Sequence, residues 1–165
     1  QKLMYSLPST LASDPQGAAF GLLAPLPMDP QPPVEAGAWS QRKAGHGNWI
    51  ELMSTDPAAG FDFYSALFGW TKSTAVDMGE MGTYQLFAWR GTDIGGMMGL
   101  GNAPQSCWLP YFGVNGVEAA MTRIADAGGT VLHGPIEVPG GAYIAVSRDP
   151  QMAHFAIVGP LDRAG

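Results

Sequence analysis

Two ionisable side chains stand inside apolar segments of the sequence, where acid–base chemistry is feasible. Glu51 lies in the segment Trp49–Met53, and His154 lies in the segment Ala153–Val158. Apolar neighbours raise the pKa of a carboxyl group, so Glu51 can act as a general base or accept a hydrogen bond from a ligand. The alternative is a partly solvated strand carboxylate. His154 can exchange protons near neutral pH and assist Glu51, and its alternative is a structural or surface imidazole.

The elements that must position these residues repeat within residues 46–160. In each half an apolar strand leads to Asp or Asn, then to a helix, a glycine and further strands. Asp56 is a good N-cap for the first helix and Gly69 ends it, while Asn115 is the expected N-cap of the second. The apolar residues at helical spacing are Phe61, Tyr64, Leu67 and Phe68 in the first helix, and Val117, Met121, Ile124 and Ala125 in the second.

The strand pattern then predicts the fold class. The predicted strands are Thr83–Trp89, Ile94–Leu100, Thr130–Glu137, Ala142–Ser147 and Ala153–Val158, with a weaker one at Lys72–Val76. We therefore expect an α+β fold in which paired βαβββ modules form a curved, half-barrel-like mixed sheet around a cavity, with the helices outside. Gly95-Gly96 opens no helix, so it is not a phosphate-binding loop, and we expect it to permit strand bending or a turn.

A second repeat, at an offset of 135 residues, bears on domain organisation. Asp14–Phe20 (DPQGAAF) recurs as Asp149–Phe155 (DPQMAHF). We expect residues 1–25 to be the closing hairpin of a preceding domain of the same type, 26–45 a proline-rich linker, 46–160 a complete domain and 161–165 a tail. The chain begins at Gln1 rather than Met, which suggests processing or a longer parent protein with two tandem domains.

Composition narrows the classes of partner. The 165 residues carry a net charge of −6 and no cluster of Lys and Arg, which disfavours nucleic acid and anionic membranes. No apolar run reaches the roughly 18 residues of a membrane span. The single cysteine, Cys107, forms no intrachain disulfide, which fits a reducing compartment, so a cytoplasmic location is expected. Cys107 is either a nucleophile or, as we favour, a small packed residue beside Trp108.

Two motifs resemble those of a known superfamily. The double βαβββ pattern with Phe61–Trp70 (FDFYSALFGW), together with the closing turn Arg148–Gln151, resembles the glyoxalase/bleomycin resistance protein/dioxygenase (vicinal oxygen chelate) superfamily, and within it the tandem-domain glyoxalase-like proteins. The resemblance covers about residues 46–160. Met152 replaces the glycine that is usual in the closing turn, which suggests a tighter or altered turn. Pairing of modules between chains is common in this superfamily, so the resemblance also allows a homodimer.

The resemblance places the superfamily's metal-ligand positions on residues that are poor ligands. Its metal-dependent enzymes bind a divalent cation through inward His and Glu side chains. The corresponding positions fall on Trp49, at or next to Leu109, and on Ala156, and the strand around Tyr84 offers no carboxylate or imidazole. The resemblance therefore implies no metal at the usual position, and no cofactor is expected, with a divalent metal disfavoured.

Strand alternation then predicts a binding surface. Residues two apart on a strand share a face, so Glu51 and His154 are the ionisable inward candidates. We expect a small aromatic or hydrophobic compound as the ligand. The alternatives are a lyase, isomerase or dioxygenase-type enzyme that uses Glu51 and His154, with or without a divalent metal, and a regulatory or interaction protein. The predicted ligand-binding residues are Trp49, Met53, Trp89, Met98, Leu109 and Tyr111.

Overall fold

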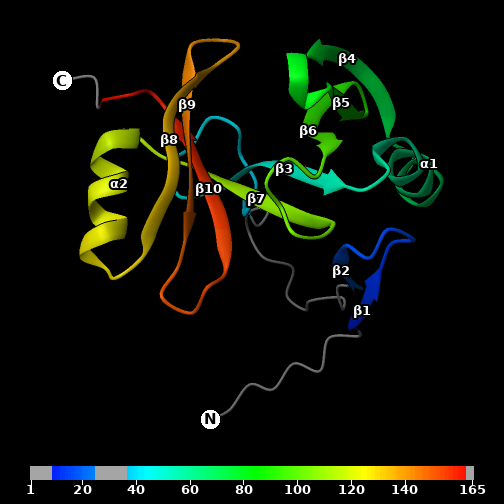
Figure 1. The fold of residues 1–165 in the computed structure, drawn as a ribbon, viewed down its shortest axis with the longest axis horizontal. Helices are drawn as coiled ribbons and strands as arrows, with labels where there is room; N and C mark the ends of the chain where they lie inside the picture. Colours follow the sequence, from blue (N-terminus) through cyan, green and yellow to red (C-terminus); the bar gives the residue numbers. More distant parts are fainter. Residues whose placement is uncertain (1–8, 25–36, 163–165) are drawn as a thin grey trace, which may run out of the picture.

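The computed structural model describes residues 9–24 and 37–162 (Figure 1). Residues 1–8 of the expected hairpin remnant, most of the expected linker and residues 163–165 of the tail lie outside these ranges. The elements are β1 (Ser9–Ser13), β2 (Ala19–Leu23), β3 (Gly47–Ser54), α1 (Pro57–Phe68), β4 (Thr71–Asp77), the 3₁₀ helix η1 (Gly79–Met81), β5 (Thr83–Trp89), β6 (Thr92–Gly99), β7 (Cys107–Gly113), α2 (Val117–Asp126), β8 (Thr130–Val138), β9 (Ala142–Arg148) and β10 (His154–Gly159).

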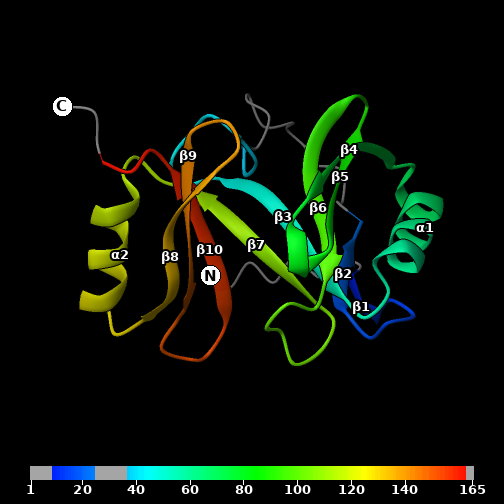
Figure 2. The same cartoon turned by 45° about the horizontal axis from the view of Figure 1, so that its top comes forward.

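Eight strands form one mixed sheet in the order β4-β5-β6-β3-β7-β10-β9-β8. Each module is a βαβββ unit whose first strand runs parallel to its last, β3 beside β6 and β7 beside β10. The two modules meet in the middle of the sheet, where β3 and β7 pair antiparallel. The helices lie at opposite ends of the molecule, outside the strands (Figures 1 and 2). The predicted fold class is therefore confirmed.

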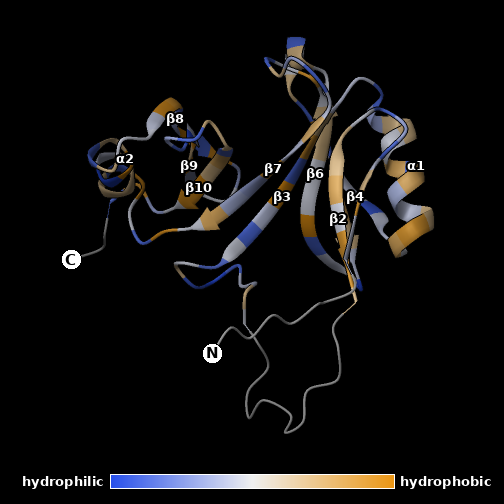
Figure 3. Cartoon of the chain, turned by 90° about the horizontal axis from the view of Figure 1, so that it is seen from below, coloured by the Kyte–Doolittle hydropathy of each residue, from blue (hydrophilic) through white to orange (hydrophobic). Residues whose placement is uncertain are grey.

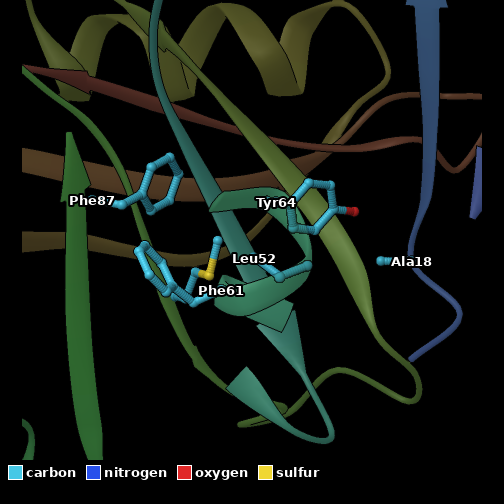
Figure 4. Close-up of a cluster of buried hydrophobic side chains, with 6 residues drawn as sticks. Ala18, Leu52, Phe61, Tyr64 and Phe87 are labelled. Carbon is cyan, nitrogen blue, oxygen red and sulfur yellow. The ribbon is translucent and has the colours of Figure 1, made fainter. Parts of the chain in front are cut away.

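Each helix covers the back of its own module with an apolar core. Figure 3 shows hydrophobic and hydrophilic residues along both helices, as expected for helices with one buried side. Leu67, predicted to join the core, is 46% exposed instead. The core under α1 contains Ala18, Leu52, Phe61, Tyr64, Phe87 and Met97 (Figure 4), and the core under α2 contains Val117, Ala120, Ala145 and Ile157. In the described part of the chain, neither helix has the length and apolar character needed to cross a bilayer.

The ends of α1 are those that the sequence predicts. The Asp56 side chain accepts a hydrogen bond from the Ala59 N–H at 3.1 Å. Gly69 adopts the left-handed conformation, with φ of 71°, directly after the last helical residue. This conformation costs a residue with a side chain about 1 kcal/mol, which is why glycine is usual here.

The start of α2 differs from the prediction by one residue. Gly116, and not Asn115, precedes the first helical residue, and it offers no side chain to cap the helix. The N–H groups of Val117 and Glu118 instead donate to the carbonyl oxygens of Pro160 and Leu161, at 2.9 and 3.1 Å. The prediction was wrong because the chain after β10 supplies these acceptors, and a local pattern does not reveal such a distant segment.

The β1–β2 and β9–β10 hairpins have the same internal geometry. Ser9 pairs with Leu23, and Ile144 pairs with Val158, so the strand register is identical at the offset of 135. Both turns are closed by an Asp whose Oδ1 accepts two backbone N–H groups, from Gln16 and Ala18 in one and from Gln151 and Ala153 in the other. The repeated sequence therefore encodes one repeated local structure.

Met152 does not alter its turn, contrary to the expectation. Its φ of 77° matches the 93° of Gly17, and each residue donates its N–H to the carbonyl of the turn aspartate at 3.0 Å. The Asp149 hydrogen bonds impose the left-handed conformation on a residue that disfavours it.

We expect Met152→Gly to stabilise the domain by about 1 kcal/mol, because it relieves this backbone strain. The Met152 side chain is 59% exposed, so little packing is lost. Urea unfolding at equilibrium measures the change. The matched control is Gly17→Ala, which introduces the same strain in the equivalent turn and should lower the free energy of unfolding. A destabilised Met152→Gly variant would contradict the interpretation.

The β1–β2 hairpin packs on α1 of the first module. The Phe20 ring meets the rings of Phe63 and Tyr64 edge-on, with centroids 6.0 and 5.4 Å apart. The Tyr64 hydroxyl donates to Asp14 Oδ2 at 3.1 Å and accepts the Trp108 indole N–H at 2.9 Å. The buried Asp14 thus joins the hairpin to the helix, and the Tyr64 hydroxyl links that contact to β7.

Candidate functional site

The face of the sheet opposite the helices, here called the inner face, carries an apolar cluster from both modules. Leu109 and Tyr111 in β7 are buried, and Trp49 and Met53 in β3 pack beside them. The structure thus brings together four of the residues predicted to bind a ligand. The full cluster is Trp49, Met53, Leu109, Tyr111, Ile144, Val146, Ala156 and Val158.

Glu51 lies among these residues and is held by two tyrosines. The Tyr111 hydroxyl donates to Glu51 Oε2 at 3.1 Å, and the Tyr84 hydroxyl is its second hydrogen-bond partner. The Trp49 indole N–H donates to the Tyr84 hydroxyl at 2.9 Å. Because Tyr84 accepts from Trp49, its own hydroxyl hydrogen is free to point at the carboxylate. These four residues form a directed network, which we call the Glu51 network.

Burial controls the acidity of this network. Desolvation raises the pKa of Glu51 above its ordinary value of 4.5, and the hydrogen bonds from Tyr84 and Tyr111 partly oppose that shift. Burial and the nearby Glu51 charge raise the pKa of both tyrosines, which therefore stay protonated as donors. Burial, and then the Glu51 charge, also raise the pKa of the Cys107 thiol, which disfavours a reactive thiolate.

The raised pKa of Glu51 predicts a stability that depends on pH. The folded chain holds the Glu51 proton more tightly than the unfolded chain, so this group weakens folding as pH rises above its ordinary pKa. Glu51→Gln removes that cost and should stabilise the fold by about 1 kcal/mol near pH 8, with no gain near pH 4. Urea unfolding at both pH values measures the difference in the free energy of unfolding between the variant and the parent. The control is Glu137→Gln, because Glu137 is exposed. A variant that is less stable than the parent near pH 8 would contradict the assignment.

Two glycines in β6 make room for aromatic rings. A Cβ on Gly96 would overlap the Tyr84 ring, and a Cβ on Gly95 would overlap Phe87 and the Ile50 carbonyl. Both glycines lie in the middle of a paired strand. The expectation of a turn is therefore wrong, whereas the β5–β6 pairing has a register irregularity directly beside Gly95. Large side chains of β5 and the backbone of β3 approach closely at these positions, so neither glycine has room for a side chain.

Sequence reasoning did not identify Tyr84 as part of the site, and it did not determine which face of the sheet carries Cys107. Tyr84 offers no imidazole or carboxylate to a metal, but a tyrosine on the strand before a Gly-Gly pair is consistent with a ring that needs space. Cys107 pairs with Met53 across the two central strands. Because residues two apart share a face, Cys107 lies on the inner face with Leu109 and Tyr111, whereas Trp108 points to the helix side.

The other predicted site residues have different surroundings. Met98 pairs with Met53 in the parallel β3–β6 ladder, which places it on the inner face. Trp89 does not belong to the inner-face cluster. It ends β5 beside the Arg90-Gly91 turn, is 46% exposed and lies under the Arg90 guanidinium at 4.4 Å. His154 is exposed at the start of β10, and β7 separates its strand from that of Glu51.

The donor set of the inner face does not fit a divalent metal. The side chains of Trp49, Leu109 and Ala156 carry no group of the kind that divalent metals bind. Glu51 is the carboxylate there, and its oxygens already accept hydrogen bonds. Within residues 9–24 and 37–162, no three His, Cys, Asp or Glu side chains lie close enough together to hold an ion.

A groove of about 540 Å³ lies elsewhere, beside the start of α2. It is lined by Phe112, which points away from the inner face, and by Arg123 of the helix. The first N–H groups of α2 already donate to backbone carbonyls, so they are not free to bind an anion. The groove shares no residue with the Glu51 network.

Comparison with known proteins places these features in a family. The anthracycline biosynthesis protein DauV of Streptomyces sp. (strain C5) is 35% identical over 124 residues, which cover 66% of this chain and 45% of DauV. CFP32 of Mycobacterium bovis is 31% identical over 150 residues, which cover 90% of this chain and 54% of CFP32. The chain thus spans about half the length of the curated relatives it matches.

The fold has solved counterparts. Methylmalonyl-CoA epimerase of Streptomyces coelicolor, solved with 2-nitronate-propionyl-CoA, superposes with a TM-score of 0.55 at 17% identity, covering 74% of this chain and all of the epimerase. At that identity the likeness concerns the fold alone. The family profile matches residues 47–157, most of the chain and nearly the whole two-module domain. The chain therefore belongs to the Glyoxalase/Bleomycin resistance protein/Dioxygenase superfamily.

Proposed function

We propose that the inner face binds a small, flat aromatic compound, with its ring system against the apolar cluster and a polar group at Glu51. The observation that carries the proposal is the Glu51 network, in which two tyrosine hydroxyls hold a carboxylate in otherwise apolar surroundings and the Trp49 indole N–H holds one of those hydroxyls. Trp and Tyr rings favour stacking with flat ligands, and a few placed polar groups set orientation in such sites.

The energetics of Glu51 support a ligand rather than a purely structural role. Burial raises its pKa, so the charged form is disfavoured in the free protein. An apolar residue at this position would pack with the cluster without that cost. The name of the relative DauV, an anthracycline biosynthesis protein, supports a fused-ring aromatic compound as the ligand class.

Binding of 2-naphthalenemethanol, a flat neutral probe, tests the proposal by isothermal titration calorimetry. Trp49→Leu should weaken binding about tenfold or more, because it removes a ring from the inner face. Trp89→Leu is the matched control, since Trp89 lies outside the cluster, and it should leave the affinity unchanged. The proposal would be contradicted if the probe showed no saturable binding, or if both variants lost the same affinity for it.

A second candidate is an enzyme in which Glu51 transfers a proton. The raised pKa of Glu51 favours it, because an efficient general base or acid has a pKa near the working pH. His154 would assist only if the ligand bridged the intervening strand β7. Elemental analysis checks the metal-dependent form of this candidate: stoichiometric metal that is lost in Glu51→Ala or His154→Ala would support it.

We also infer that residues 9–24 are the closing hairpin of a preceding module in a tandem-domain protein. The shared register and turn of the two hairpins support this, as does the length of the relatives. The full-length protein is then expected to have about 275 residues, as the coverage of DauV implies, and about 1.7 times the 17.3 kDa mass of this chain, which intact mass spectrometry measures. A full-length protein of 17.3 kDa would contradict the inference.

A further inference from the structure

We propose that the ligand of the inner face is a flat aromatic compound that bears a protonated amine, with the ammonium group at Glu51. This inference rests on the proposed function of the inner face as a small-molecule site. It adds the charge of the ligand, which the aromatic surface alone does not specify.

The Glu51 carboxylate has no cationic partner among the described residues. Burial and two tyrosine hydroxyls account for the shift in its pKa, and no Lys, Arg or His contributes. Lys72 lies over the Phe61 ring at 5.0 Å, and Arg90 lies over Trp89 at 4.4 Å. Arg148 in β9 is separated from β3 by two intervening strands. A bound cation would supply the missing charge.

The geometry of the network also favours a cation over a neutral or anionic group. A carboxylate has about four acceptor positions, and the hydroxyls of Tyr84 and Tyr111 occupy two. An ammonium group brings three donors, so it can fill the acceptor positions of the carboxylate that the two hydroxyls leave open. An anionic ligand would meet a like charge in a poorly solvated place.

The groups that face Glu51 determine how this preference depends on pH. They are Trp49 on its own strand, Tyr84 from β5, and Cys107 and Tyr111 from β7. The neighbours of Glu51 in β6 are Gly96 and Met98, which have no titratable side chain. Both tyrosines and the thiol have raised pKa values and stay neutral. Deprotonation of Glu51 is then the event that strengthens binding of the amine as pH rises, while binding of a neutral probe stays constant.

Three probes that share one ring system test the inference: 2-naphthylmethylamine, 2-naphthalenemethanol and 2-naphthoic acid. Isothermal titration calorimetry near pH 7.5 should show the amine binding about tenfold tighter than the alcohol, and the acid weakest. Glu51→Gln should reduce the advantage of the amine over the alcohol from about tenfold to about twofold or less. The matched control is Glu137→Gln, because Glu137 is an exposed glutamate that also accepts from a tyrosine, Tyr143.

The outcomes separate this inference from the proposed function. If the alcohol binds and Trp49→Leu weakens it, but the amine is no tighter, the charge assignment is overturned and the aromatic site stands. A preference for the amine that survives Glu51→Gln also overturns the assignment. If none of the three probes binds, the proposed function fails as well. Tenfold tighter amine binding that disappears in Glu51→Gln, and persists in Glu137→Gln, supports the inference.

Discussion

Replacing Ala18 by arginine is expected to detach the β1–β2 hairpin from the domain. Ala18 has no exposed surface and lies beside Tyr64 (Figure 4). The adjoining Asp14 accepts the Tyr64 hydroxyl at 3.1 Å, so detachment also breaks a buried hydrogen bond to a carboxylate. Overpacking and the lost bond together should lower the free energy of unfolding by about 3 kcal/mol.

Hydrogen exchange of the β1 and β2 amides, together with urea unfolding, measures this effect. The matched control is Ala153→Arg, at the equivalent position of the β9–β10 turn. Ala153 donates the same backbone hydrogen bond to its aspartate at 2.8 Å but is exposed, so its replacement should change stability by less than about 0.5 kcal/mol. Equal losses of stability in the two variants would show that the turn itself does not tolerate arginine, and that packing of the hairpin on α1 is not the cause.

Gly96→Ala is expected to disrupt the Glu51 network through Tyr84. The added methyl group occupies space that the Tyr84 ring now fills, and backbone pairing on both sides of β6 prevents the strand from moving away. Tyr84 must shift, which breaks its hydrogen bonds with Trp49 and Glu51. We expect a loss of stability of about 2 kcal/mol and weaker binding of 2-naphthalenemethanol by about tenfold or more.

Calorimetry of that probe and urea unfolding test the prediction. Gly99→Ala is the control, because it makes the same change in the same strand at a position where a Cβ meets nothing within 4 Å. The control should keep both the stability and the affinity of the parent. If Gly96→Ala behaves like Gly99→Ala, the tight approach of Tyr84 to β6 is not what positions the network.

Local patterns in the sequence predicted most of the fold. The N-cap Asp56 and the C-terminal Gly69 set the ends of α1 because both act through bonds within one or two turns. Thr83–Trp89 was predicted with the observed bounds of β5. The other strand bounds shifted by one or two residues; β6, for example, begins at Thr92 because Arg90 and Gly91 alone make the turn. Such ends depend on pairing partners, which a single strand does not reveal.

The site was only partly predictable, for a related reason. Strand alternation correctly grouped Trp49, Met53, Leu109 and Tyr111 on one face. It could not show that Tyr84 reaches Glu51, because that contact crosses from β5 over the glycines of β6. Hydrogen bonds between strands that are not neighbours depend on the curvature and the side-chain volumes of the whole sheet.

The antiparallel pairing of β3 with β7 has a consequence for how the proposed site is divided between the two modules. Glu51, Tyr84 and Trp49 come from one βαβββ unit and Tyr111 from the other, so the site straddles the seam where the copies join. Either unit expressed alone would carry an incomplete site, whereas two fragments that reassemble through their central strands would regain it.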